Sequence, residues 1–348
     1  MYRISRRQLI QFGAASAGLA MVGAPTSFAQ SVPTIKSMHY GGPWAVLEKV
    51  GQQFAERGLA RMAYEVENSG TALAKMQVQK DNPPFNVALL TRVVAIRAMN
   101  TGLIEPLKPG DIGDAGALVS GALVPGGIGV ALTFDSIDLM YDSRRVTNPI
   151  ESWLDLWRPE FKGKILMPAL PLPLGHLIVV TIAKALGGSE RDPKAIDEAF
   201  KKLKELKPSI RAFYRDPIQA NQLIERGEAL VCPQYNNRIG NAMKASPTIS
   251  RATPKEGIPV SAYDLVVVKG SPHQDIARKY VNFCLATPVQ QQIANAILTV
   301  PVNKSAKVDP ANAKYVMHDY SRLWFVDEVY VATKQRELFD RWAREIES

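Results

Sequence analysis

Short glycine- and hydroxyl-containing segments near the start of the chain have residue types that can bind a small anion. Gly41 and Gly42 precede one expected helix, and Ser69, Gly70 and Thr71 open another. The first N–H groups of a helix have no partner within the helix, and the helix dipole favours negative charge there. The same residues suit ordinary helix capping, so the sequence leaves both interpretations open.

Aromatic and charged side chains accompany these segments. Tyr40 and Trp44 flank the two glycines, and Thr91 and Arg92 directly follow an expected strand. Arg92 offers a positive charge to an anionic ligand, and its alternative role is that of a solvated helix residue. Because these loops contain an arginine and no clustered acids, we expect the ligand to be a small organic anion or a zwitterion.

A second set of polar residues follows expected strands further along the chain. Tyr235, Asn236 and Asn237 lie between a strand and a helix, and His176 ends the neutral segment "LPLPLGH". In an open α/β sheet, ligands bind beyond the carboxyl ends of the strands. We therefore expect ligand contacts from these residues, with helix capping as the alternative role of the asparagines.

Motifs for catalysis and cofactor binding are missing from the sequence. In "GGIG" (126–129) the third glycine of a dinucleotide fingerprint is replaced by Leu132, so a turn or hinge is the better interpretation. There is no GxSxG nucleophile elbow, no phosphate loop and no HExxH, and the four histidines lack metal-ligand spacing. We expect no enzyme activity, no cofactor and no metal, although a triad built from distant residues stays open.

The elements that must position these residues alternate between strands and helices. Expected strands in the first part are 34–40, 61–68 and 85–90, and expected helices are 41–58, 71–81 and 92–102. In the second part, strands are expected at 163–168, 210–214 and 229–234, and helices at 176–188, 193–207 and 217–227. This alternation is typical of an α/β fold with mainly parallel sheets flanked by helices.

Two β-rich segments flanked by glycine are suited to connect the two groups of elements. They are "GGIGVALTFDS" (126–136) and "VSAYDLVVVKG" (260–270). We therefore expect two lobes joined by two β-type crossings. Lobe I would contain residues 30–131 and 264–308, and lobe II would contain residues 132–263 and 309–348.

The first 29 residues have the features of an export signal. Arg6 and Arg7 precede the apolar run 12–22, and "SFAQ" favours cleavage after Ala29. The run is too short for a transmembrane helix. The paired arginines resemble a twin-arginine signal, with an ordinary secretory signal as the alternative. We expect a periplasmic protein.

The composition excludes several other classes of protein. Loss of the three leader arginines lowers the formal net charge from +9 to +6, and the basic residues form no block of the kind that binds nucleic acid. Cys232 lies in an expected strand and Cys284 in an expected helix, so we expect two buried free thiols rather than a disulfide.

The stretch "ESWLDLWRPEFKGKILMP" (151–168) is the most specific in the chain, and further segments follow a recognisable order at 83–90, 101–107, 252–296 and 298–303. Together they resemble extracellular solute-binding proteins, the periplasmic receptors of ABC importers, in the branch of polyamine and iron binders. The resemblance implies a two-lobe clamp around a small-molecule ligand, with an ABC permease of the inner membrane as partner. We expect a monomer. A secreted α/β enzyme and a sensory binding module are the alternative classes.

The resemblance adds Tyr263 and Asp264 to the expected ligand contacts. They stand where the polyamine branch places a ligand-binding carboxylate, so Asp264 is a candidate partner for a ligand amine. One carboxylate cannot satisfy a buried polycation, and the neighbouring tyrosines of iron(III) binders are missing. A polyamine or ferric iron is therefore the alternative to an organic anion or zwitterion.

Overall fold

The computed structural model describes residues 32–123, 126–170, 172, 174–316 and 320–348. The expected leader, with Arg6 and Arg7, lies outside the described residues. Residues 33–348 form one compact unit. Among the described residues, no helix is both long and apolar enough to cross a membrane.

The first group of elements confirms the predicted alternation of strands and helices. It contains β1 (Thr34–His39), α1 (Val46–Ala55), β2 (Arg61–Val66), α2 (Ser69–Val78), β3 (Val87–Thr91), α3 (Arg92–Asn100) and β4 (Ile104–Glu105). Leu47, Val50 and Phe54 recur at helical spacing in α1 and are buried, because this face packs into the core. Gly102, at φ +70°, allows the chain to leave α3 in a left-handed turn.

The second group also follows the predicted order. It contains β6 (Ile165–Pro168), α4 (Leu174–Ala185), α5 (Pro193–Leu206), β7 (Ile210–Tyr214), α6 (Pro217–Glu225), β8 (Val231–Tyr235), α7 (Asn236–Ala245) and β9 (Ile249–Ala252). Trp153, Leu156 and Phe161 are fully buried beside these elements, which explains why the segment 151–168 is rich in aromatic residues. The aromatic side chains of this segment therefore serve the core and not a ligand.

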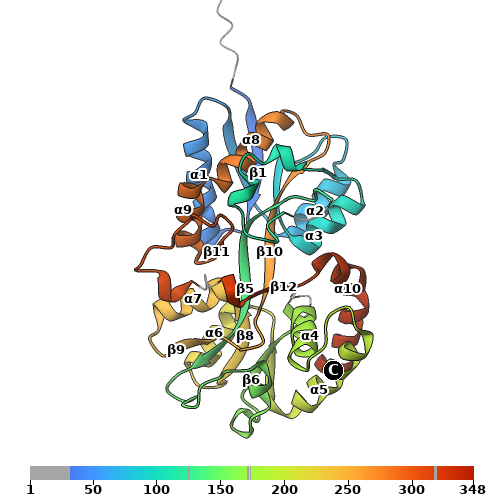
Figure 1. The fold of residues 1–348 in the computed structure, drawn as a ribbon, viewed down its shortest axis with the longest axis vertical. Coiled ribbons are helices and arrows are strands. Elements are labelled where there is room, and N and C mark those ends of the chain that lie inside the picture. The colour runs from blue at the N-terminus through green and yellow to red at the C-terminus, as the bar shows by residue number, and fades with distance from the viewer. Residues whose placement is uncertain (1–31, 124–125, 171, 173, 317–319) are drawn as a thin grey trace, which may run out of the picture. The chain divides into compact units, whose positions relative to one another are not determined.

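Two long strands run through both groups, as the glycine-flanked segments predicted. They are β5 (Val130–Asp142) and β10 (Ile258–Val268), and they pair antiparallel (Figure 1). Along β5, Phe134 belongs to the core that contains Leu47 and Phe54, and Ile137 belongs to the core that contains Trp153. We call these the first and second cores. The chain thus passes from one core to the other between residues 134 and 137 of β5.

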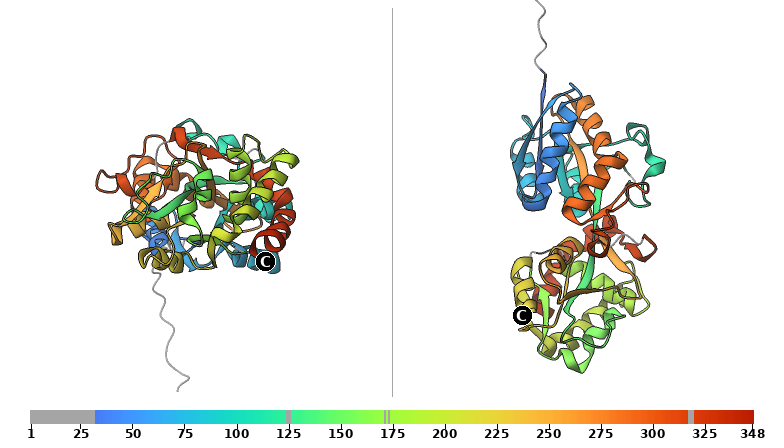
Figure 2. Two further views of the ribbon diagram at one scale, coloured as in Figure 1. Left: turned by 90° about the horizontal axis from the view of Figure 1, so that it is seen from below. Right: turned by 90° about the vertical axis from the view of Figure 1, so that its left-hand side faces the viewer.

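The remaining elements return to both cores. They are α8 (Gln274–Leu285), α9 (Thr287–Ile297), β11 (Val300–Pro301), β12 (Leu323–Phe325) and α10 (Glu328–Trp342). Helices α8 and α9 pack on the first core, whereas α10 packs on the second, close to the C-terminus (Figure 2). The exact lobe boundaries stay a prediction.

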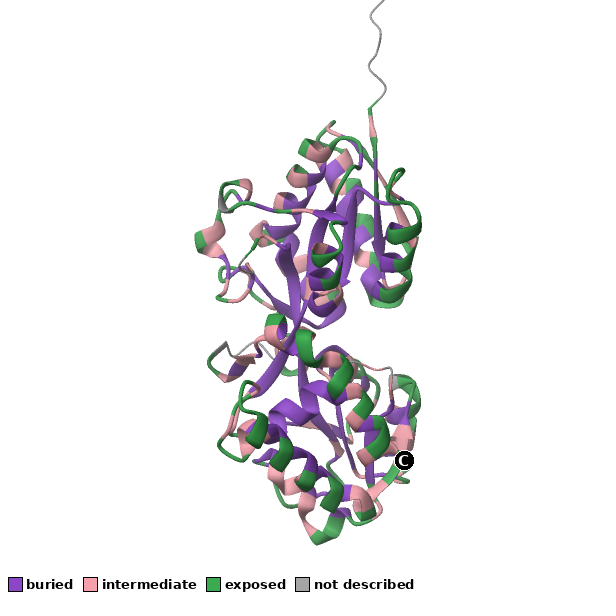
Figure 3. Ribbon diagram, turned by 90° about the vertical axis from the view of Figure 1, so that its right-hand side faces the viewer, coloured by how far each residue is buried: buried purple, intermediate pink, exposed green. Residues whose placement is uncertain are grey.

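Among the described residues, β1 and β2 form a small sheet of their own, and the other strands form one mixed sheet that is largely buried in both groups (Figure 3). The mixed pairing differs from the mainly parallel sheets that the sequence predicted, because the two long strands pair antiparallel with each other and with β3 and β8. The pairs β1–β2, β6–β7 and β6–β8 are parallel, and β3, β4, β8 and β9 pair antiparallel with the long strands. The α/β class with two crossings is confirmed. Cys232 and Cys284 are buried and free, as expected.

Candidate functional site

The strand register places predicted site residues from both groups on one face of the sheet. Tyr263 of β10 lies opposite Thr91 of β3, and Ser261 of β10 lies opposite Asp135 of β5. Tyr235 of β8 lies opposite Ile137 of β5. Directly opposed side chains share a face, and side chains two residues apart along a strand share it too. Thr91, Tyr263, Asp135 and Tyr235 therefore point to the same side.

Three aromatic rings gather at this face. The ring centroid of Tyr263 lies 4.8 Å from that of Trp44 and 5.3 Å from that of Tyr40, and Tyr40 lies 5.3 Å from Trp44. Tilted and edge-on contacts of this kind are the favoured geometries of aromatic pairs. We call Tyr40, Trp44 and Tyr263 the ring cluster. Such rings can pack against an aliphatic chain or attract a cation.

Hydrogen bonds fix the position of the ring cluster. The hydroxyl of Tyr40 donates to the carbonyl of Leu89 at 3.0 Å and lies 2.5 Å from the hydroxyl of Ser69. Ser69 also accepts the backbone N–H of Thr91 at 2.9 Å. Burial raises the pKa of Tyr40 far above its usual value, so its hydroxyl stays neutral. Ser69 and Thr91 thus support the rings.

Arg92 and Asp264, predicted separately as partners for opposite ligand charges, bind each other. Nε of Arg92 donates to Oδ2 of Asp264 at 3.0 Å, and Nη2 donates to Oδ1 at 2.7 Å. Nη1 donates to the carbonyl of Gly121 at 2.8 Å. All three nitrogens of the guanidinium group are therefore occupied in this conformation, and both oxygens of Asp264 accept from it.

Glu328 completes this charged group. Its carboxylate lies 3.8 Å from Nε of Arg92, at the start of α10, and it is 5% exposed. Burial raises the pKa of Glu328 to about 8, although Arg92 favours the ionised form. One arginine of α3 thus contacts carboxylates from β10 and from α10.

The start of α7 joins Asp135 to Asn237. The backbone N–H of Asn237 donates to Oδ1 of Asp135 at 3.2 Å. Within the described residues, Oδ2 of Asp135 and Oδ1 of Asn237 have no hydrogen-bond partner, and both atoms are shielded from solvent. Burial raises the pKa of Asp135 to about 7, against the opposing effects of this N–H group and of Arg238.

Asn236, next to Asn237, links α7 to the end of α9. Its side-chain amide donates to the carbonyl of Leu298 at 2.6 Å. Leu298 has φ +64°, which directs the chain out of α9. This bond connects an element beside the second core with one that packs on the first.

The glycine- and hydroxyl-containing helix starts serve mainly local structure. The N–H of Gly41 donates to Nδ1 of His39 at 3.0 Å, and Gly41 and Gly42 both have positive φ. The N–H of Thr71 donates to Oδ1 of Asn68 at 2.9 Å, which caps α2. Gly70 and Thr71 are exposed. The capping interpretation therefore describes these N–H groups in this structure.

His176 lies apart from the other predicted residues. It belongs to α4, is buried, and its ring centroid lies 5.6 Å from that of Phe339 in α10. Burial lowers the pKa of His176 to about 4, so the ring is neutral. Its side chain therefore packs with the second group of elements.

Three charged residues were missed by sequence reasoning. An acid inside the apolar strand segment "VALTFDSIDL" was a usable signal for Asp135, because isolated acids are rare in buried strands. Arg238 follows the predicted asparagines directly. Glu328, in contrast, resembles any acidic residue in the first turn of a helix, and sequence gives no signal for it.

The described residues contain no group of three or more histidine, cysteine, aspartate or glutamate side chains arranged to hold a metal ion. The chemistry that this arrangement offers is noncovalent recognition by rings, hydroxyls and charges.

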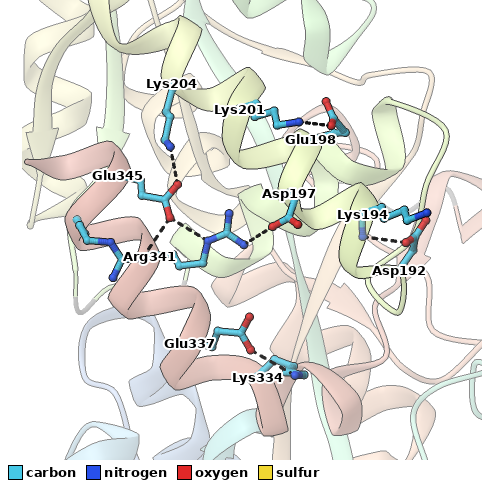
Figure 4. A network of polar contacts seen from close by, with 11 residues as sticks. Asp192, Lys194, Asp197, Glu198, Lys201, Lys204, Lys334, Glu337, Arg341 and Glu345 are labelled. Carbon is cyan, nitrogen blue, oxygen red and sulfur yellow. Dashed lines mark hydrogen bonds and ion pairs between the residues drawn. The ribbon is translucent and has the colours of Figure 1, made fainter.

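A separate charged network joins α5 to the C-terminal helices (Figure 4). Arg341 donates to Asp197 at 2.8 Å and to Glu345 at 3.0 Å, and Lys204 lies 2.8 Å from Glu345. The guanidinium of Arg341 also lies 3.9 Å from the ring centroid of Phe200. This network anchors the chain end to the second group of elements.

Comparisons with known proteins find similarities over most of the chain. The model of a family described as bacterial extracellular solute-binding protein matches residues 82–324. The chain is 27% identical over 301 residues to a gamma-aminobutyric acid-binding protein of Pseudomonas aeruginosa, covering 82% of this chain and 81% of that protein.

Two further similarities extend the comparison. The chain is 31% identical over 148 residues to the spermidine/putrescine-binding periplasmic protein of Escherichia coli, covering 42% of this chain and 41% of that protein. A crystal structure of an ABC transporter protein from Clostridium perfringens has the same fold, with a TM-score of 0.78 at 24% identity, covering 90% of this chain and 99% of that one.

Proposed function

The chain belongs to the bacterial extracellular solute-binding protein family and is the periplasmic solute-binding protein of an ABC transporter, and we propose that its solute is a small zwitterion with one ammonium and one carboxylate group. This class includes gamma-aminobutyric acid (GABA) and related ω-amino acids. The proposal narrows the expected choice between an organic anion and a zwitterion.

The pairing of Arg92 with Asp264 carries this proposal. A buried polyamine needs a carboxylate for each ammonium, because an unpaired buried charge is costly. Asp264 already accepts two hydrogen bonds from Arg92. Among the described residues near the ring cluster, Asp135 has an oxygen without a hydrogen-bond partner, and the base Arg238 lies close enough to influence the pKa of Asp135. A ligand with one ammonium and one carboxylate group can pair with this acid and this base.

The names of two similar proteins point to a zwitterion and to polyamines as ligands. The Pseudomonas aeruginosa protein is named for GABA, a zwitterion, and its match covers most of both chains. The Escherichia coli protein is named for spermidine and putrescine, and its match covers less than half of each. A polyamine is therefore the alternative ligand.

The contact residues that we propose surround the shared face of the sheet. The ring cluster of Tyr40, Trp44 and Tyr263 would pack against the aliphatic part of the ligand, and Tyr235 and Asn237 would close over it from the second group. Ser69, Thr91 and the Arg92–Asp264 pair would act as supports. We propose that lobes I and II, with the boundaries given above, move apart about β5 and β10 to admit the ligand.

We also propose how the protein is used. It is a monomer that releases its ligand unchanged to an ABC permease of the inner membrane, without catalysis. Export would follow the twin-arginine route. Replacing Arg6 and Arg7 by lysine keeps the charge but removes the recognition signal, so precursor should accumulate in the cytoplasm. Normal processing of this variant would favour the general secretory route.

A thermal-shift panel tests the ligand class. GABA, glutamate, succinate, putrescine, spermidine and ferric citrate are compared with buffer. A ligand at about a hundredfold excess over Kd stabilises the folded protein by about 2.7 kcal/mol, which raises the melting temperature by several degrees. We expect this shift from GABA or another ω-amino acid. A shift from the polyamines alone, or from succinate alone, overturns the zwitterion proposal and leaves the transporter role intact.

A further inference from the structure

Two buried oxygen atoms beside the ring cluster lack hydrogen-bond donors within the described residues. They are Oδ2 of Asp135 and Oδ1 of Asn237, and Asp135 itself is 0% exposed and Asn237 7% exposed. A buried acceptor without a donor costs free energy, so native proteins rarely keep one without a purpose. Here two such atoms belong to neighbouring residues, because the N–H of Asn237 donates to the other oxygen of Asp135.

The strand register directs Asp135 to the ligand side of the sheet. It lies opposite Ser261, and Tyr263, two residues further along β10, projects to the same face. Tyr235 lies on that face through its pairing with Ile137. Tyr263 pairs directly with Thr133, which lies two residues from Asp135 on β5, so the carboxylate and the Tyr263 ring are diagonal neighbours on this face.

The neighbouring charged side chains do not satisfy these two oxygens. The guanidinium group of Arg251 contacts other partners. Its Nε lies 3.2 Å from Oδ2 of Asp138, and its Nη2 donates to the carbonyl of Tyr315 at 2.7 Å. Asp138 lies three residues from Asp135 on β5, so its side chain points to the opposite face of the strand. Arg238 is near enough to affect the pKa of Asp135 but makes no hydrogen bond to its Oδ2 within the described residues.

We infer that Oδ2 of Asp135 and Oδ1 of Asn237 form the subsite for the ligand ammonium group. An ammonium group has three donors and no acceptor, which suits two acceptor oxygens beside aromatic faces. This inference rests on the proposed function in its choice of a zwitterion as ligand. The subsite itself would accept a primary ammonium group from any ligand that the protein binds.

The subsite predicts proton release on binding. Asp135 has a pKa of about 7, because it is buried, so it is only partly ionised near neutral pH. An ammonium group favours the ionised carboxylate, and binding must therefore release a proton and weaken as the pH falls below about 7. The charged groups close enough to influence the pKa of Asp135 are Arg238 of α7 and, from the opposite face of β5, Asp138 and its partner Arg251 of β9.

The subsite is tested by removing the ammonium group from the ligand and the charge of Asp135 from the protein, separately and together. The affinities of GABA, butyrate, putrescine and n-butylammonium are measured by calorimetry for the wild-type protein and for Asp135→Asn. Butyrate lacks only the ammonium group of GABA. In the wild type we expect each amine to bind, and in the variant we expect each to bind about 10- to 100-fold more weakly, because a charged hydrogen bond is lost. The affinity for butyrate should stay within a few-fold.

Asp138→Asn is the matched control, because it removes a buried acid from the same strand on the opposite face. We expect it to leave the ratio of GABA to butyrate affinity unchanged. Calorimetry in two buffers of different ionisation enthalpy should show proton release in the wild type and its loss in Asp135→Asn.

The outcomes of these measurements separate the two proposals. If putrescine or butylammonium binds in an Asp135-dependent way and GABA does not bind, the zwitterion proposal fails and the subsite stands. If Asp135→Asn weakens GABA and butyrate equally, or if no amine binds the wild type, the subsite is overturned. Unchanged proton release in Asp135→Asn would overturn it too, because another group would then titrate.

Discussion

Arg92 and Asp264 form a bidentate buried ion pair that joins α3 to β10, with nitrogen–oxygen distances of 3.0 and 2.7 Å. The Arg92 side chain is 8% exposed and that of Asp264 is 0% exposed. Such a pair offsets the desolvation of both charges only while both partners are present. The pair therefore affects the stability of the fold and also decides whether the carboxylate of Asp264 is available to a ligand.

Removal of one partner should destabilise the fold strongly. In Arg92→Met the carboxylate of Asp264 stays buried with Glu328 nearby, and we expect the free energy of unfolding to fall by about 3 to 5 kcal/mol. The double variant Arg92→Met/Asp264→Leu removes both charges and should lose less than the sum of the two single changes. Urea denaturation measures all three. Additive losses would show that the two residues act independently.

The same change should alter ligand preference. Arg92→Met leaves the carboxylate of Asp264 without its guanidinium partner, so a second ligand ammonium group can pair with it. We expect the ratio of putrescine affinity to GABA affinity to rise by about tenfold, the value of one charge-assisted hydrogen bond. Calorimetry below the melting temperature of the variant measures the ratio. An unchanged ratio would mean that Asp264 is not accessible to ligand.

The Arg92–Asp264 pair also shows which features of the fold and the site can be predicted from sequence. The α/β class, the two crossings and most elements were predictable, because hydrophobic periodicity and glycine positions are local signals. Arg92 and Asp264 were each identified as site candidates. Their mutual pairing was not predictable, because the two residues lie 172 positions apart and meet only when β3 pairs with β10.

The positions of Asp135 and Glu328 in the site also depend on long-range strand pairing, which sequence does not reveal. Sequence placed Asp135 within a crossing strand but could not tell which face its side chain would take, because the register of β5 against β10 decides this. Glu328 becomes part of the charged group only because β12 pairs with β10 and delivers the start of α10 to Arg92.

Glu328 should make stability depend on pH in a direction opposite to that of an ordinary ion pair. Its pKa is about 8 in the folded protein and about 4.5 when unfolded, so the folded state holds the proton more tightly. The contribution is fully present below about pH 4.5 and is lost as the pH rises toward 8, by at most about 1.4 kcal/mol per pH unit.

Comparison with Glu328→Gln isolates this effect. The variant carries a neutral group of the same size, so its unfolding free energy should exceed that of the wild type increasingly from about pH 5 to about pH 8. Asp135 and Asp138 also have raised pKa values, but they titrate in both proteins and cancel. A difference that stays constant with pH would contradict the assignment.

The network around Arg341 predicts the opposite pH dependence (Figure 4). Desolvation opposes ionisation of Glu345, but hydrogen bonds from Lys204 and Arg341 outweigh it and lower the pKa to about 2. This stabilisation is present above about pH 4.5 and is lost as the pH falls toward 2. Glu345→Gln should cost about 1 kcal/mol at neutral pH and nothing in acid. Glu337→Gln, which breaks only the exposed pair with Lys334, is the control and should have a smaller effect.

Asn236 should control how firmly the ligand is held. Its amide donates to the carbonyl of Leu298, so it connects α7 beside the second core to the end of α9 on the first. If the two groups separate to release ligand, Asn236→Ala removes a bond that exists only while they are together. The variant therefore favours the separated state. Ligand should dissociate about five- to tenfold faster, because one hydrogen bond is worth about this factor, and the association rate should change little.

Stopped-flow measurements on the proposed ω-amino acid give both rates. Asn241→Ala, which breaks a bond within α7 only, is the control. A slower association rate with unchanged dissociation would mean that the bond shapes the open protein instead.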